Sequence, residues 1–287
     1  MPTIQAPAGA PSPAAVMARA ETENFPVASR VLPRRARSHL LAIYGFARLV
    51  DELGDSTPGD RLASLDWLEE ELDRAYDGRA EHALLKRLEP TLRECSLPRE
   101  PFVRLIEANR MDQRVRRYET WDELRGYCSL SADPVGELVL GVLGLATPAR
   151  IALSDSICTA LQLAEHCQDV AEDLAADRVY LPREDLDRFG ADTTELAAKH
   201  AGGPLKAVVA FEVARARGLL ADGAPLIDEL GGRPRLAVVA FVAGGGSALD
   251  AIERAGFDVL PGPPRATRGR RLLVTVRTLF ERRGRDR

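Results

Sequence analysis

Two apolar stretches of helical period, more than a hundred residues apart, each end in two aspartates spaced four residues apart. The first pair is Asp51 and Asp55, and the second is Asp169 and Asp173. On an α-helix, residues four apart differ by about 40° around the axis and by about 6 Å along it, so both carboxylates leave the same face. This pattern predicts paired acids at the ends of largely apolar helices.

The rest of the chain favours an all-α fold. Aromatic residues make up only 5% of the 287 residues, whereas Ala and Leu are abundant, which suits helices better than sheets. Apolar residues recur with helical period, and Pro and Gly clusters separate the segments. The predicted helices cover residues 35–53, 60–76, 81–95, 100–117, 134–146, 150–176, 204–229 and 234–256. We expect a leader without fixed structure at 1–16, one helical domain at 17–262 and a basic tail at 263–287.

One segment also allows a different interpretation. The apolar run at 237–242 followed by three glycines at 244–246 could be a strand that leads into a phosphate-binding turn. However, the glycines do not match GxGxxG, and no βαβ pattern surrounds them. A helix that crosses another helix closely explains the glycines better.

Composition excludes several classes of protein. With 45% hydrophobic and 29% charged residues, the chain has the composition of a globular protein. Its four cysteines form no CxxC pair, so neither a disulfide framework nor a zinc cluster is predicted. The first residues lack the charged start and apolar core of a secretion signal, and the uncharged stretches are shorter than the roughly 18 residues of a membrane span. We therefore expect a cytoplasmic protein.

The C-terminal end is strongly basic. Residues 265–287 contain nine Arg against Glu281 and Asp286, whereas the whole chain has a net charge of −4. Such an end is usually a solvated tail. Apolar residues between the arginines leave open a second interpretation, a peripheral contact of residues 265–287 with the inner face of a membrane. No nucleic-acid partner is expected.

Two acids near a helix end are, taken alone, most often a solvated terminus. Held close together and partly buried, however, two carboxylates raise each other's pKa unless a cation neutralises them. The presence of a second pair favours this alternative, because two such helices could present four carboxylates to one cavity. Oxygen ligands alone suit Mg²⁺, which keeps waters and is completed by phosphate oxygens of a substrate. The sequence therefore predicts a Mg²⁺ site that binds a diphosphate.

Two arginines lie close to the acid pairs in the sequence. Arg48 precedes the first pair by one turn, and Arg178 follows the second pair. Each could hold the diphosphate and stabilise its departure, or form a salt bridge at the edge of the core. Acids, metal ions and an apolar helical bundle together are suited to ionising a hydrocarbon diphosphate and shielding the carbocation from water.

Several motifs resemble those of the squalene/phytoene synthase family, which contains the head-to-head isoprenoid synthases. They are ENFPVAS at 23–29, LLAIYGFARLVDELGD at 40–55, DPVG at 133–136 shortly after Tyr127, and LQLAEHCQDVAEDLAADRVYLPREDL at 161–186. Within the family the chain is most similar to the hydroxysqualene synthase branch. ENFPVAS, DPVG and the Gln that precedes the second acid pair carry that similarity, since phytoene-type relatives commonly have Arg at this Gln.

The resemblance implies a single-domain helical bundle of the class I isoprenoid synthase type with a central cavity. It also implies that the two acid pairs bind Mg²⁺. Around the diphosphate it places Arg48, Gln162, Arg178 and Tyr180, and along the prenyl pocket Phe25, Tyr44, Tyr127, Ala132 and Gly136, with Asp112 as an additional acid. Glu165, next to the second acid pair, is also expected among the substrate-binding residues. By their spacing alone, the pocket residues would be ordinary core residues, and Asp112 could belong to a surface ion pair.

Three positions depart from the family pattern. Glu165 replaces a usual Asn, Asp133 replaces a common Asn, and Glu52 stands where many relatives have a second Asp. His166 lies on the same helix edge as the second acid pair, and we expect it to be a packed histidine and not a base.

The resemblance implies a Mg²⁺-dependent enzyme that ionises presqualene diphosphate and lets water capture the cation, giving hydroxysqualene and diphosphate. The first alternative is head-to-head condensation of prenyl diphosphates to presqualene diphosphate, squalene or phytoene. An alternative from a different class is a non-catalytic helical protein that docks through its basic tail.

Overall fold

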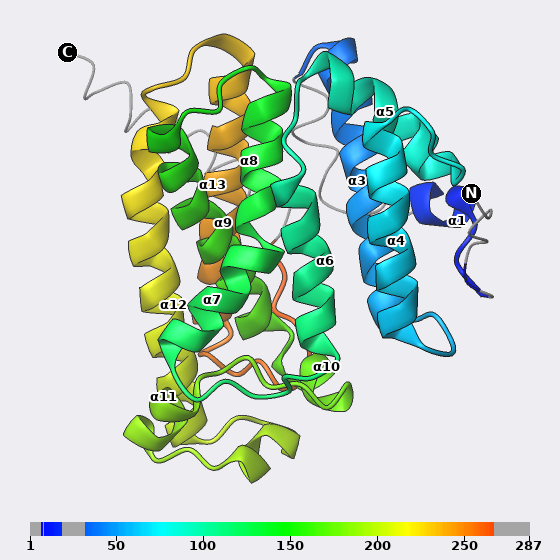
Figure 1. The fold of residues 1–287 in the computed structure, drawn as a ribbon. Helices are drawn as coiled ribbons and strands as arrows, with labels where there is room; N and C mark the ends of the chain where they lie inside the picture. Colours follow the sequence, from blue (N-terminus) through cyan, green and yellow to red (C-terminus); the bar gives the residue numbers. More distant parts are fainter. Residues whose placement is uncertain (1–6, 8, 19–31, 267–287) are drawn as a thin grey trace. The chain divides into compact units, whose positions relative to one another are not determined.

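A computed structural model describes residues 7, 9–18 and 32–266 of the chain (Figure 1). Within these residues the regular structure is helical, and the only strand-like feature is an isolated β-bridge between Arg117 and Val179. The all-α prediction is confirmed. The run of three glycines lies inside a helix, which rules out the alternative of a strand leading into a phosphate-binding turn.

The helices are largely those that the sequence predicts, with some additions. They are α1 (Pro13–Ala18), α3 (Arg34–Asp55), α4 (Arg61–Tyr76), α5 (Ala83–Glu94), α6 (Glu100–Asp112), α7 (Trp121–Ser131), α8 (Asp133–Val142), α9 (Pro148–Gln168), α10 (Val170–Ala175), α11 (Arg183–Phe189), α12 (Gly203–Gly223) and α13 (Gly232–Arg254), with short 3₁₀ helices η2 (Thr193–Ala197) and η3 (Ala224–Ile227). The sequence did not predict α1, α7 or α11.

Local signals explain where two of these helices begin. Asp60 precedes α4 and its side chain accepts a hydrogen bond from the Ala63 amide at 3.0 Å. Thr120 precedes α7 in the same way and accepts from the Glu123 amide at 3.3 Å. A side-chain oxygen at this position satisfies one of the amides that lack a partner in the first turn of a helix.

The chain divides into two compact units. Unit 1 contains residues 1–114 and 134–151, and unit 2 contains residues 115–133 and 152–287. Each unit is described by itself below. The predicted domain boundaries at residues 17 and 262 stay a prediction.

In unit 1, α3 is the helix around which the others pack. It contacts α1, α4, α5 and α6, and α4 also contacts α5 and α6. Phe46 of α3 and Phe102 of α6 are fully buried and meet edge to face, with ring centroids 5.1 Å apart. Burying aromatic rings in this geometry stabilises the packing of these two helices beyond the area that they remove from water.

In unit 2, α12 contacts α11, α13 and η3. A glycine in α13 allows the close approach of a neighbouring helix, because a Cβ atom on Gly245 would lie 2.6 Å from Leu161 Cδ2 of α9. At Gly223, at the end of α12, the neighbour is backbone and cannot move aside as a side chain can, since a Cβ atom would lie 2.6 Å from the backbone oxygen of Leu153. The small residues of these helices thus serve close packing.

Of the helices in the described residues, α13 alone is long and apolar enough to cross a membrane, judged by length and composition. Half of the most apolar 18-residue stretch of this helix is buried inside the protein. Its uncharged run, residues 236–249, is shorter than a membrane span because Arg235 and Asp250 bound it. A buried core helix meets the same criterion, and α13 packs against α12.

Candidate functional site

The first acid pair lies in the last turn of α3, in unit 1. Tyr44, Ala47, Arg48 and Asp51 form a half-buried face of this helix, and Asp55 extends the face as an exposed residue. The other faces carry the buried core residues of α3. The prediction that the two acids continue one helix face is confirmed, and the one acid that is partly buried is Asp51.

Arg48 contacts both neighbouring acids of this turn. Its Nη2 donates to Glu52 Oε1 at 3.1 Å, and its Nη1 lies 3.8 Å from Asp51 Oδ2. The Arg48 side chain is 23% exposed and that of Asp51 is 51% exposed, so the guanidinium is the better shielded group. A guanidinium in this place can bind an anion that approaches the acid pair.

A residue that the sequence analysis did not single out contacts the first pair. Asn109 of α6 is buried, and its Nδ2 lies 3.5 Å from Asp51 Oδ1, which is a long hydrogen bond. Its position in the sequence gave one signal, because it is a polar residue with a largely apolar stretch before it. Asp112, at the end of the same helix, is 5% exposed, so the alternative of a surface ion pair does not hold for it.

The second acid pair lies in unit 2, where the predicted helix at 150–176 is interrupted. α9 ends at Gln168, Asp169 has non-helical backbone angles (φ −102°, ψ 17°), and α10 starts at Val170. The hydrogen-bond pattern continues across the interruption, because the Asp169 amide donates to the Glu165 oxygen at 2.9 Å and the Asp173 amide to the Asp169 oxygen at 2.8 Å.

The electrostatic environment of Asp169 disfavours its negative charge. Burial is the largest cause that raises the pKa of its carboxyl group, and the charge of Glu172 raises it further, while Arg265 acts in the opposite direction. A cation bound to this carboxylate would offset both effects.

Asp173 lies near a buried histidine. His166 is 6% exposed, its Nε2 lies 3.3 Å from Gln162 Nε2, and its Nδ1 lies 3.9 Å from Asp173 Oδ2. Burial lowers the pKa of His166 to about 3. The imidazole is therefore neutral at physiological pH, and its approach to Asp173 is a polar contact and not an ion pair. This agrees with the expectation of a packed histidine.

An aromatic cluster adjoins this histidine. Tyr180 stacks on the His166 ring, with centroids 3.8 Å apart, and Tyr127 lies 5.4 Å from Tyr180. Tyr118, which the sequence analysis did not single out, stacks on Tyr180 with centroids 5.8 Å apart. The cluster brings predicted diphosphate and pocket residues together in unit 2, next to the second acid pair.

The turn after α10 brings Arg178 back to this pair. Asp177 has a left-handed backbone (φ 59°), and the Arg178 amide donates to the Asp173 oxygen at 2.8 Å. This is the hydrogen bond of a Schellman motif, in which the residue after the left-handed position reaches back to the last turn of the helix. Arg117 supports the turn by donating to the Asp177 backbone oxygen at 2.6 Å.

The remaining predicted residues have different environments. Ala132 and Gly136 are buried, Glu165 is exposed, and Phe25 lies outside the described residues. Asp133, the departure in the DPVG motif, is 1% exposed and accepts hydrogen bonds from Arg125 at 2.8 Å and Thr159 at 2.9 Å. Its carboxylate is therefore bound by Arg125 and Thr159, both within unit 2.

Among residues 7, 9–18 and 32–266, no group of three or more His, Cys, Asp or Glu has the arrangement of a metal site. The two acid pairs belong to different units, and the prediction that they face one cavity stays a prediction. Their donor chemistry does fit Mg²⁺, because both pairs offer carboxylate oxygens alone and the charge of Asp169 is disfavoured without a cation.

Comparison with known proteins gives consistent matches. A sequence model of the family described as squalene/phytoene synthase matches residues 18–277. The hydroxysqualene synthase of Rhodopseudomonas palustris is 39% identical over 212 residues, which are 72% of this chain and 71% of the relative. The phytoene synthase of Mycobacterium tuberculosis is 32% identical over 218 residues, which are 74% of this chain and 71% of the relative.

Solved structures agree with these sequence matches. The crystal structure of squalene synthase HpnC from Alicyclobacillus acidocaldarius matches with a TM-score of 0.80 and 46% identity, over 84% of this chain and 92% of that chain. A dehydrosqualene synthase in complex with a ligand matches with a TM-score of 0.86 at 22% identity, over 95% of this chain and 96% of that chain. The second match supports the fold alone.

Proposed function

The chain belongs to the squalene/phytoene synthase family, and from that premise we propose that it converts presqualene diphosphate and water into hydroxysqualene and diphosphate. The family implies a prenyl diphosphate substrate and general dependence on Mg²⁺. The finer assignment rests on one observation, the higher identity of this chain to relatives named hydroxysqualene synthase than to relatives named phytoene synthase.

In the proposed reaction, the C–O bond of presqualene diphosphate breaks and the diphosphate leaves with both bonding electrons. The resulting cation rearranges, a water oxygen forms a bond to it, and a proton is released. Magnesium, when bound, would supply the positive charge that neutralises the leaving diphosphate. We propose that Asp51, Asp55, Asp169 and Asp173 hold it.

Arg48 and Arg178 are proposed to bind the leaving diphosphate. Arg48 already lies beside Asp51 and Glu52, and the backbone of Arg178 is fastened to the last turn of α10 by its hydrogen bond to Asp173. A guanidinium that is held before the substrate arrives, as that of Arg48 is, loses little freedom on binding, so its attraction for the developing charge is used in the reaction.

The aromatic cluster of unit 2 suits the stabilisation of a carbocation. Tyr180, Tyr127 and His166 form a compact set of aromatic rings beside the second acid pair, and the neutral His166 adds no positive charge that would repel the cation. The negative face of an aromatic ring attracts a cation, and an apolar wall excludes water until the rearrangement is complete.

Product analysis tests the proposal. The purified chain is incubated with presqualene diphosphate or with farnesyl diphosphate, in each case with Mg²⁺ and without NADPH, and the lipid products are separated by mass. We expect hydroxysqualene from presqualene diphosphate and no product from farnesyl diphosphate alone. A product formed from farnesyl diphosphate alone would instead favour head-to-head condensation, the activity class of the phytoene synthases that also match the chain.

We also propose a cytoplasmic location with a peripheral membrane contact through residues 265–287, most of which lie outside the described residues. The support is the excess of Arg in this segment. Flotation with anionic vesicles would compare the full chain with a chain that ends at residue 264. Equal flotation of the two chains would refute the contact.

A further inference from the structure

The last turn of α3, which carries the first acid pair, is fastened by groups from outside the helix. The last carbonyl groups of a helix lack partners within it. Here Glu52 O accepts from the Ser56 amide and from the Thr57 amide and hydroxyl, each at 3.0 Å. Gly54 O accepts from the side-chain amide of Gln113, which follows α6, at 2.9 Å.

Gln113 joins two backbone carbonyl groups of unit 1. Its Nε2 donates to Gly54 O at 2.9 Å and to Asn109 O at 3.0 Å. Both partners can only accept, so the amide nitrogen and not the amide oxygen must face them. The carbonyl of Gly54 belongs to the peptide group that leads into Asp55, so this hydrogen bond holds the backbone just before Asp55.

Asn109 of α6 packs against the same turn of α3. A Cβ atom on Gly54 would lie 2.1 Å from Asn109 Oδ1, so the place of a side chain at this position is taken by the Asn109 amide. Asn109 and Gln113 are four residues apart and share one face of α6. That face lies against the helix turn between Asp51 and Asp55.

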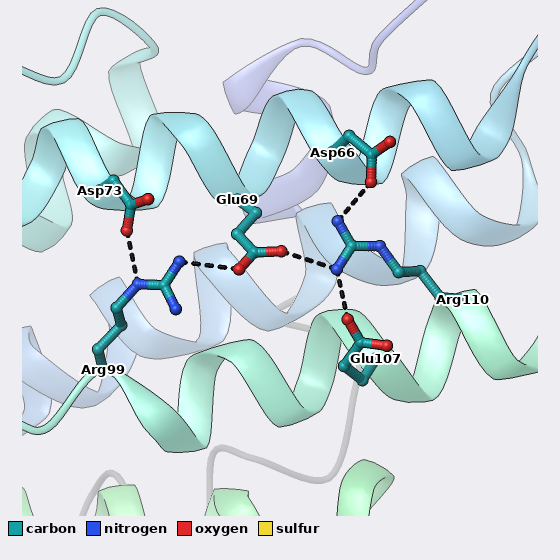
Figure 2. Close-up of polar contacts among 6 residues, drawn as sticks. All are labelled: Asp66, Glu69, Asp73, Arg99, Glu107 and Arg110. Carbon is teal, nitrogen blue, oxygen red and sulfur yellow. Dashed lines mark hydrogen bonds and ion pairs between the residues drawn. The ribbon is translucent and has the colours of Figure 1, made fainter.

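A different face of α6 is anchored to α4 by an ion network (Figure 2). Arg110 donates to Glu69 Oε2 at 2.7 Å and to Asp66 Oδ1 at 2.5 Å. Arg99, just before α6, donates to the other oxygen of Glu69 at 2.8 Å and to Asp73 at 2.5 Å. Burial opposes the ionisation of Glu69, yet the hydrogen bonds and charges of the two arginines outweigh it and lower the pKa of this carboxyl group. Glu69 is therefore ionised and joins Arg99 and Arg110 at the centre of the network.

We propose that Gln113 is a positioning residue for the first acid pair. The ion network holds α6 on α4, and the hydrogen bond from Gln113 to Gly54 holds the last turn of α3 on α6. Asp51 and Asp55 therefore keep the spacing that Mg²⁺ ligation needs. This inference rests on the proposed function, because it assumes that these acids bind Mg²⁺ with diphosphate. Groups that orient metal ligands commonly change metal affinity by about tenfold or more when they are removed.

The test compares Gln113→Leu with a matched control, Tyr76→Phe. Both substitutions remove a side-chain donor to a backbone carbonyl of unit 1, since the Tyr76 hydroxyl donates to Leu97 O at 3.1 Å. The readout is the thermal unfolding midpoint of the full chain at fixed inorganic diphosphate and increasing Mg²⁺. The Mg²⁺ dependence of turnover is measured in parallel.

We expect both variants to unfold at a lower temperature than wild type without Mg²⁺. Gln113→Leu should then need about tenfold more Mg²⁺ than wild type for a half-maximal shift, whereas Tyr76→Phe should need the wild-type concentration. Gln113→Glu, which keeps the shape but presents a carboxylate to two carbonyl oxygens, should behave like Gln113→Leu.

The outcomes separate this inference from the proposed function. If wild type shows no Mg²⁺-dependent shift and forms no product, the proposed function fails and this inference fails with it. If wild type responds and Gln113→Leu responds at the same Mg²⁺ concentration, only this inference fails. Failure of both Gln113 variants to fold would also overturn it, because Gln113 would then be a residue of the fold alone.

Discussion

The imidazole ring of His166 stacks on the phenol ring of Tyr180, with centroids 3.8 Å apart and planes 15° from parallel. This contact joins α9 to the segment after α10 and lies beside the second acid pair. Because burial keeps His166 neutral, the stack brings no positive charge near Asp173 from this side. The stack also makes the unit sensitive to acid, since protonating His166 requires it to leave its buried place.

The first prediction concerns stability against acid. The folded pKa of His166 is about 3, below the value of about 6.5 in an unfolded chain, so the unfolded state binds the proton first. Stability from this residue is present above about pH 6.5 and is lost as the pH falls toward 3. Between about pH 7.5 and 5.5, wild type should lose about 1 kcal/mol more free energy of unfolding than His166→Phe, measured by denaturant titration. Equal losses in the two proteins would contradict this prediction.

The second prediction concerns a buried carboxyl group whose effect on stability changes with pH in the opposite direction to that of His166. Glu212 is 0% exposed, and burial raises its pKa to about 8, although Arg215 acts against the rise. Its folded pKa exceeds the unfolded value, so its contribution to stability is complete below about pH 4.5 and is lost as the pH rises through 8.

For Glu212, the advantage of wild type over Glu212→Gln should shrink from about pH 5 to about pH 8, by at most about 1.4 kcal/mol per pH unit. Denaturant titration of both proteins at the two pH values measures this change. Because Gln does not titrate, the variant is the reference against which the pH dependence of the wild type is read. A difference that stays constant with pH would show that Glu212 is ionised throughout.

The third prediction concerns the acid pairs. Changing Asp51, Asp55, Asp169 or Asp173 to Asn should lower turnover of presqualene diphosphate by about a hundredfold or more, because each change removes the charge of a proposed metal ligand. The unfolding midpoint should change little at the exposed Asp55. Chelating Mg²⁺ with EDTA should stop turnover in wild type, and adding Mg²⁺ should restore it. Normal turnover in an Asn variant would remove that aspartate from the site.

The fourth prediction uses three helical glycines as a matched set. Gly54→Ala should cost about 1–3 kcal/mol, because the new Cβ meets the Asn109 side chain, and truncating Asn109 to Ala should recover part of this cost. Gly223→Ala meets the backbone oxygen of Leu153, so no single side-chain truncation should rescue it. Gly218→Ala meets open space on α12 and should stabilise the chain by about 0.5–1 kcal/mol.

For this set, thermal and denaturant unfolding of each variant provide the measurement, with the Gly54→Ala and Asn109→Ala double variant completing the cycle. Additive costs in that double variant would show that the two residues do not interact.

Much of the fold could be predicted from the sequence because helical period is a local property. α3, α4 and α13 follow from the spacing of apolar residues along a few turns, and their observed ends lie within about two residues of the predicted ones. α7 was missed because it is short and mixes polar with apolar residues, and its start depends on the capping hydrogen bond of Thr120.

The sequence by itself also determined which acids pair on one helix face, since four residues make about one turn. The tertiary structure decided which polar groups become neutral, which are buried and which hydrogen-bond to another helix. His166 is uncharged, Asp112 is buried, and Gln113 reaches Gly54 because helices distant in the sequence pack against them. The physical reason is that burial and partner choice depend on distances between elements, which side-chain packing sets and no local spacing encodes.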